Sequence, residues 1–315
     1  MWYSPHLMHI PDGFLSVLVA VLFWIFSALI VSLAIRQVSQ ERDERKLPVM
    51  GVLAAAIFAG QMLNFAVAGG TSGHLLGATI ATIIAGPWAA ILVMTCVVAI
   101  QALIFQDGGL LAMGANIFNM AVVGVSVSYL IYSLFLKLSK RQRWGYYAGS
   151  GVGAWSAIET ASLAAGLQLS LSGTSPANIA IPAMAGIHAL IGIGEALITL
   201  GAITFFMSTR PDLLTSPSQA VRGRSRLWIV GLALSVILAI LSPLATVHPD
   251  GLEWVAEQKG FIKLAQPSVF RLIPDYIVPG INNTTLATII AGLVGILIII
   301  GVFLILNRFR HKTNK

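Results

Sequence analysis

The sequence MHIPDGFLS, residues 8–16, stands directly before the first long apolar run of the chain. If Met8 begins the mature protein, its α-amine, the backbone amide nitrogen of His9 and the imidazole of His9 form three neighbouring nitrogen donors. Joined by five- and six-membered chelate rings, they occupy three corners of a square plane, a geometry that suits Ni(II), Cu(II) and some Co(II) sites. The fourth donor must come from elsewhere, and we expect His74, in GGTSGHLLG (69–77), to supply it.

The composition is that of a membrane protein. Of the 315 residues, 57% are hydrophobic and 10% are charged, whereas a soluble domain carries about 25% charged residues. The net charge of +7 lies in short clusters between apolar runs, which is typical of topology determinants and argues against a nucleic-acid partner. Cys96 is the single cysteine, so neither a disulfide framework nor a thiolate metal site is expected. The expected fold is all-α, with many helices in the lipid membrane.

Four clusters of Lys and Arg determine the predicted topology. They fall within residues 36–46, 137–143, 210–226 and 308–315, and outside them stand only Lys259, Lys263 and Arg271. Because cytoplasmic segments are enriched in Lys and Arg, all four clusters are placed on the cytoplasmic side, with an even number of crossings between them. The nine predicted spans are 14–35, 49–67, 74–86, 88–105, 110–136, 146–169, 180–208, 227–247 and 284–306. This puts the N-terminus outside and the C-terminus in the cytoplasm.

The predicted spans form two groups. Residues 8–210 would form a seven-helix metal-binding module, preceded by residues 1–7 as an extension or a start site placed too early. A basic cytoplasmic linker (211–226), a module of two helices with an outer loop (227–306) and a cytoplasmic tail (307–315) would follow. The piece at 74–86 is short for a span and begins at His74. Interrupted backbone is tolerated at membrane depth only where protein shields it or it lines a cavity, so a binding site is expected there.

Two signatures resemble known families. MHIPDGFLS and GTSGHLLGA closely resemble the nickel/cobalt substrate-binding components of energy-coupling-factor transporters, the CbiM/NikM type, over about residues 8–210. That resemblance implies a metal site made by the amine of Met8, the amide and imidazole of His9, and His74. Residues 1–7 depart from the pattern, because an amine on Met1 would be seven residues away. PDGLEWVAE (249–257) resembles the PDGLE-type, NikN-like accessory module, over about residues 225–310.

The first resemblance also implies a function. It predicts high-affinity capture of Ni2+ or Co2+ at the outer face of the cytoplasmic membrane of a prokaryote. The ATPase subunits and the transmembrane coupling (T) component would be separate proteins. In agreement, the sequence has no GxxxxGK[ST] loop and no HExxH motif, so neither ATP hydrolysis nor zinc-protease activity is expected of this chain. No organic cofactor is expected, and the residues do not distinguish nickel from cobalt.

Several polar residues have two interpretations. Asp12 is either the N-cap of a helix starting at residue 13 or 14, or a carboxylate that orients an imidazole. Gln61 and Asn64, just before GGTSGH, either support the metal site or make ordinary contacts between helices. A short amphipathic helix is predicted at 252–259. Its carboxylates are interpreted as a solvated face, with a metal-gathering surface as the alternative: Asp250, Glu253 and Glu257.

The second predicted helix carries small residues at four-residue spacing, Gly51, Ala55 and Ala59. Such spacing allows another helix to approach closely. We expect this face either to dock the coupling component or to pack inside the chain.

The alternative function rests on ionisable residues inside predicted spans, namely Glu159, His188 and Glu195. Residues of this kind within a membrane indicate an ion or proton pathway. They would suit a proton-coupled secondary transporter of divalent metals that works without an ATPase.

Overall fold

The computed structural model describes residues 8–41, 46–209 and 224–313. The extension at 1–7 and most of the predicted linker at 211–226 lie outside the described residues. The regular secondary structure of the described chain is helical apart from one short two-stranded sheet, so the predicted all-α class is confirmed. Its helices are α1 (Val17–Gln40), α2 (Lys46–Gln61), α3 (Ala78–Ala85), α4 (Pro87–Ile100), α5 (Met113–Ile117), α6 (Gly124–Leu138), α7 (Arg143–Leu171), α8 (Ala177–Thr209), α10 (Arg224–Leu241), α11 (Gly251–Gln258) and α12 (Thr284–Thr313).

Five helical stretches of the described chain are long and apolar enough to cross a membrane: 17–40, 87–105, 113–138, 177–209 and 284–309. The second includes a π-helical turn, Gln101–Phe105, and the third contains another, Phe118–Val123, which joins α5 to α6. Along α1, large apolar side chains such as Leu18, Phe26 and Leu29 are exposed, as expected for a helix that faces lipid. The total of nine spans remains a prediction, because the other helices are shorter or less apolar.

A β-hairpin replaces the end of the second predicted span. Helix α2 ends at Gln61, and β1 (Phe65–Val67) then pairs antiparallel with β2 (Thr71–Gly73). Gly69 and Gly70 form the turn with φ of +83° and +78°, which glycine adopts without steric cost. Because the next helix begins at residue 78 rather than at 74, His74 lies in the connection between hairpin and helix.

The entry to α1 differs from the predicted cap. Asp12 does not cap its own helix, because Gly13 turns the chain with a φ of +92° and Ser16 is the N-cap. The Asp12 carboxylate instead accepts hydrogen bonds from the backbone N–H groups of Leu110 and Ala112, both at 3.0 Å. Asp12 therefore connects the N-terminal segment to the start of α5.

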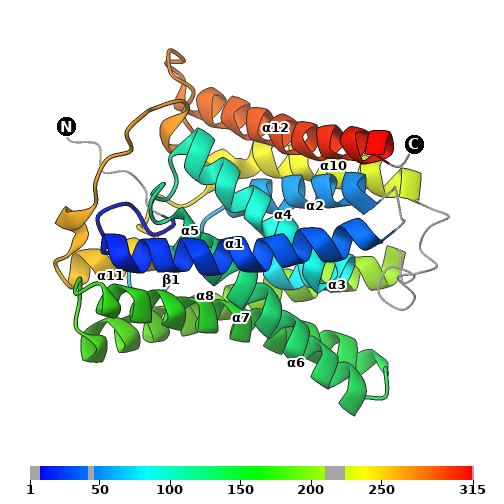
Figure 1. The fold of residues 1–315 in the computed structure, drawn as a ribbon, viewed down its shortest axis with the longest axis horizontal. Helices are drawn as coiled ribbons and strands as arrows, with labels where there is room; N and C mark the ends of the chain where they lie inside the picture. The colour runs from blue at the N-terminus through cyan, green and yellow to red at the C-terminus, as the bar shows by residue number, and fades with distance from the viewer. Residues whose placement is uncertain (1–7, 42–45, 210–223, 314–315) are drawn as a thin grey trace.

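The two last long helices, α10 and α12, pack along α2 (Figure 1). The small residues Gly51, Ala55 and Ala59 of α2 are buried, and a Cβ added at Gly51 would lie 2.8 Å from Cβ of Phe303 on α12. Internal packing, one of the two interpretations from the sequence, thus accounts for this face. Helix α12 also continues through the predicted tail to Thr313.

The start of α1 and α11 lie together at one end of the helix bundle (Figure 1). The β-hairpin reaches this end, since β2 contacts α11 and its residue Ser72 forms a parallel bridge with Asp250. Segments that lie far apart in the sequence therefore meet at the same place.

Candidate metal centre

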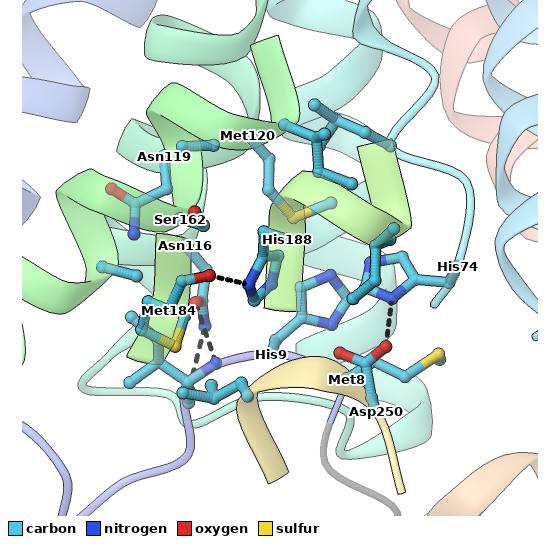
Figure 2. A pocket seen from close by; sticks show the side chains of 17 residues that line it. Met8, His9, His74, Asn116, Asn119, Met120, Ser162, Met184, His188 and Asp250 are labelled. Carbon is cyan, nitrogen blue, oxygen red and sulfur yellow. Dashed lines mark hydrogen bonds and ion pairs between the residues drawn. The ribbon is translucent and has the colours of Figure 1, made fainter. Parts of the chain in front are cut away.

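His9 and His74 lie next to each other, with ring centroids 5.6 Å apart. Together with Met8, His188 and Asp250 they line a cavity of about 70 Å³ (Figure 2). These residues come from the segment before α1, the hairpin–α3 connection, α8 and the segment before α11. The structure thus brings the two histidines predicted from the sequence into one small cavity.

The ring of His9 is held by a carboxylate. Its Nδ1 lies 2.9 Å from Oδ1 of Asp107, and both side chains are almost fully buried. The hydroxyl of Tyr276 donates to the other oxygen of Asp107 at 2.7 Å. Burial alone would raise the pKa of Asp107, but His9 and the two hydrogen bonds outweigh it and hold that pKa below its usual value. Nε2 of His9 is buried without a hydrogen-bond partner among the described residues.

The main chain beside His9 is fixed by an amide side chain. The N–H of Ile10 donates to Oδ1 of Asn116, and Nδ2 of Asn116 donates back to the carbonyl of Ile10, both at 3.0 Å. The N–H of Gly109 donates to the same carbonyl at 2.9 Å. These bonds determine where the backbone nitrogen and the ring of His9 stand relative to the cavity.

His74 also pairs with a carboxylate, since its Nδ1 lies 3.1 Å from Oδ1 of Asp250. Burial works against protonation of this ring, but the charge and hydrogen bond of Asp250, together with the charges of Asp107 and Glu195, outweigh it. The pKa of His74 is therefore raised above its usual value. The connection after His74 is held by Glu195, which accepts from the N–H groups of Leu76 at 2.7 Å and Gly77 at 3.0 Å.

The predicted supporting residues act on the backbone and not on the imidazoles. Nε2 of Gln61 donates to the carbonyl of Leu76 at 2.9 Å, and the carbonyl of Asn64 accepts from the N–H of Thr246 at 3.1 Å. Asp12 bonds to the start of α5, as described above. The carboxylates that orient the rings are residues 107 and 250 instead.

The sequence interpretation missed Asp107 and Tyr276, and it was wrong about two other carboxylates. Asp250 and Glu253 are only 4% and 3% exposed, so they do not form a solvated face; Glu257 is exposed as predicted. The one signal for Asp107 is its position in QDGG, a charged residue in a break between apolar runs. Nothing in the sequence pairs it with His9.

Side chains alone do not complete a metal site. In residues 8–41, 46–209 and 224–313, no three His, Cys, Asp or Glu side chains gather closely enough to hold an ion. A metal here would therefore need backbone nitrogen donors as well as the imidazoles. The six-membered chelate ring with the His9 amide closes only through Nδ1, which the structure pairs with Asp107. Planar coordination thus requires the His9 ring to leave Asp107.

Of the three residues of the alternative function, only His188 lines the cavity of His9 and His74. His188 faces the cavity of His9 and His74, with its Nδ1 2.8 Å from the carbonyl oxygen of Met184 (Figure 2). Glu195 binds the connection after His74, and Glu159 is not among the residues that line the cavity. Their arrangement therefore favours a structural role for Glu195 over a shared proton path.

The apolar helices and the histidine-lined cavity define a multi-pass membrane protein with a candidate transition-metal site. Residues 9–213 match the family described as the cobalt uptake substrate-specific transmembrane region, CbiM, and residues 225–312 match the PDGLE domain. The chain belongs to the CbiM family and carries a C-terminal PDGLE domain. Both resemblances predicted from the signatures are confirmed.

Two related proteins match this chain over nearly its whole length. It is 35% identical over 306 residues to a putative fused nickel transport protein NikMN of Archaeoglobus fulgidus, covering 96% of this chain and 99% of the relative. It is 34% identical to a probable fused nickel transport protein LarMN of Lactiplantibacillus plantarum, covering 98% and 99%. A crystal structure of a transition metal transporter matches with a TM-score of 0.60 and 34% identity, over 69% of this chain and all of that one.

Proposed function

We propose that this chain captures Ni2+ or Co2+ at the outer face of the cytoplasmic membrane, as the substrate-specific component of an ATP-driven energy-coupling-factor importer. The observation that carries the proposal is the meeting of His9 and His74 at one cavity, where Asp250 holds Nδ1 of His74 and leaves its Nε2 free. Membership of the CbiM family supports the substrate class.

The proposed ligands are the amine of Met8, the amide nitrogen and Nδ1 of His9, and Nε2 of His74. Nε2 is the free nitrogen of His74 because Asp250 holds its Nδ1. On loading, the metal takes the place of the proton that Nδ1 of His9 shares with Asp107, and that proton moves to Nε2 of the same ring. The amide proton of His9 is released to solvent. Four nitrogen donors in a plane disfavour Mg(II) and Ca(II), which prefer oxygen ligands, and Zn(II), which favours tetrahedral sites.

The remainder of the importer would be separate proteins, the coupling (T) component and the ATPase subunits. In this arrangement residues 8–210 form the binding module and residues 227–306 the PDGLE-type module. The chain crosses the membrane nine times, with its N-terminus outside and its C-terminus in the cytoplasm. The Lys and Arg clusters support this orientation.

The first test measures Ni(II) and Co(II) binding by calorimetry, with protein beginning at Met8 beside protein beginning at Met1. His74→Ala tests the fourth ligand. His248→Ala is the matched control, because this exposed histidine near the site hydrogen-bonds to Ser72 and Thr246 through its backbone carbonyl and N–H. We expect tight binding with the Met8 start, lost in His74→Ala and kept in His248→Ala. Equal binding by both starts would remove the amine from the ligand set, and no binding by either would overturn the proposal.

A second test separates ATP-driven import from proton-coupled transport, the alternative that uses Glu159, His188 and Glu195. Radioactive nickel uptake is measured in proteoliposomes with this chain alone under a pH gradient, and with the coupling and ATPase subunits plus ATP. We expect sustained uptake only in the second case. Uptake by the chain alone, abolished by Glu195→Gln while binding persists, would establish the alternative.

A further inference from the structure

We infer that Asp250, which belongs to the PDGLE domain, is a positioning residue of the metal site: it holds Nδ1 of His74 and so presents Nε2 as the metal donor. This role rests on the proposed function, because it acts through a proposed ligand. Residues 246–258 of the PDGLE domain would then form part of the binding site itself, and not only an accessory to it.

The contact between the two residues is direct and shielded from water. Nδ1 of His74 lies 3.1 Å from Oδ1 of Asp250, and the two side chains are 12% and 5% exposed. Figure 2 shows Asp250 beside His74 at the edge of the cavity. A carboxylate on the second ring nitrogen fixes the tautomer and orientation of a metal-binding histidine and strengthens it as a donor.

Hydrogen bonds join the backbone segments that carry His74 and Asp250. Just before His74, the N–H of Ser72 donates to the carbonyl of Pro249 at 2.8 Å, and its hydroxyl donates to the carbonyl of His248 at 2.9 Å. The hydroxyl of Thr71 donates to the carbonyl of Pro249 at 3.0 Å. Both donor residues are fully buried. These bonds fix Asp250 and His74 relative to each other through two short stretches of main chain.

The same segment is packed tightly on α8. A Cβ added at Gly251 would lie 2.6 Å from Cδ1 of Ile191 and 3.0 Å from Cε1 of His188. Leu252, the next residue, is buried and lines the cavity itself. The first turn of α11 therefore forms one wall of the cavity, and the backbone that carries Asp250 is packed in place beside it.

The test uses the complete chain in the form that binds metal in the calorimetry above. It compares Asp250→Ala, Asp250→Asn and His74→Ala with Glu257→Ala, which removes an exposed carboxylate from the short helix that follows Asp250. Ni(II) and Co(II) affinities and the visible absorption of the loaded protein are measured for each. We expect Asp250→Ala to weaken binding by about 10- to 100-fold and to shift the absorption bands. Asp250→Asn should recover part of the affinity because its amide oxygen still accepts from Nδ1, and Glu257→Ala should match the wild type.

The outcomes distinguish this role from the proposed function. If His74→Ala abolishes binding while Asp250→Ala keeps wild-type affinity and absorption, the positioning role fails and the proposed function stands. If His74→Ala has no effect, the proposed site itself fails. Weaker binding with unchanged absorption would indicate a merely structural contact and would also overturn the positioning role. If Asp250→Ala does not fold, the same criteria apply to Asp250→Asn, which preserves the side-chain volume.

Discussion

Nδ1 of His9 lies 2.9 Å from Oδ1 of Asp107, although 98 positions separate the two residues in the chain. A carboxylate can only accept a hydrogen bond, so the proton of a neutral His9 ring lies on Nδ1 and its Nε2 carries the free lone pair. The bond joins the segment before α1 to the connection between α4 and α5. It therefore determines both the position and the tautomer of the proposed ligand.

The tautomer of His9 can be observed by 15N NMR of labelled histidine. We expect a protonated Nδ1 on neutral His9 in the metal-free protein, and a change of tautomer in Asp107→Ala because the acceptor is removed. Saturation with Ni(II) should remove the Nδ1 proton, since the planar chelate uses that nitrogen. Glu41→Gln, a remote exposed substitution, should leave the spectrum unchanged. A proton that persists on Nδ1 at saturating Ni(II) would make Nε2 the donor and refute the planar chelate.

Metal binding should weaken as the pH falls, because protons compete with the metal for the nitrogen donors. Burial favours the neutral ring of His74, but Asp250, with smaller contributions from the charges of Asp107 and Glu195, outweighs it and raises the pKa of His74. Competition at this ring therefore begins at a higher pH than for a free imidazole, whose pKa is about 6.5. Asp250→Asn removes the negative charge, lowers the pKa of His74 and should move this part of the decline to lower pH. Affinities measured between about pH 5.5 and 8.5 would show it, and identical profiles for the two proteins would contradict it.

Gly109→Ala should disturb the segment that carries His9. A Cβ at Gly109 would lie 2.1 Å from Oδ1 of Asp12 and 2.2 Å from its backbone nitrogen, so the two segments must separate. Overpacking of this kind costs about 1–3 kcal/mol, and we expect a lower thermal midpoint together with weaker Ni(II) binding. Gly201→Ala is the control, because nothing lies within 4 Å of a Cβ there. Equal thermal midpoints for the two variants would argue against the close approach.

Glu195→Ala should destabilise the connection after His74. The substitution leaves the N–H groups of Leu76 and Gly77 without their acceptor at a fully buried position, at a cost of about 1–3 kcal/mol for each donor. We expect a lower thermal midpoint and weaker metal binding, measured on the same samples. Glu159→Ala, which removes a partly exposed carboxylate, should have a smaller effect. An unchanged midpoint in Glu195→Ala would show that these hydrogen bonds do not hold the connection.

The prediction of helices succeeded where an apolar run is long and ends in charged residues. The runs that became α1, α8 and α12 were placed within a few residues of their ends, apart from the helical extension of α12 to Thr313. Prediction failed at 62–77, because a short apolar stretch does not reveal whether it continues a helix or forms a hairpin. In this stretch Gly69 and Gly70 allow the hairpin turn, because both adopt positive φ.

The sequence by itself determined the fold class and the family, and it singled out the two histidines that line one cavity, because hydropathy and two short signatures are local properties of the chain. Only the tertiary structure decided which carboxylate meets which ring. Asp107 reaches His9 across 98 residues and Asp250 reaches His74 across 176. Such pairs are set by the packing of α5, α7, α8 and α11 around one cavity, and no periodicity in the sequence encodes them. The role of Asp250 is invisible until the PDGLE domain is seen to lie against the hairpin.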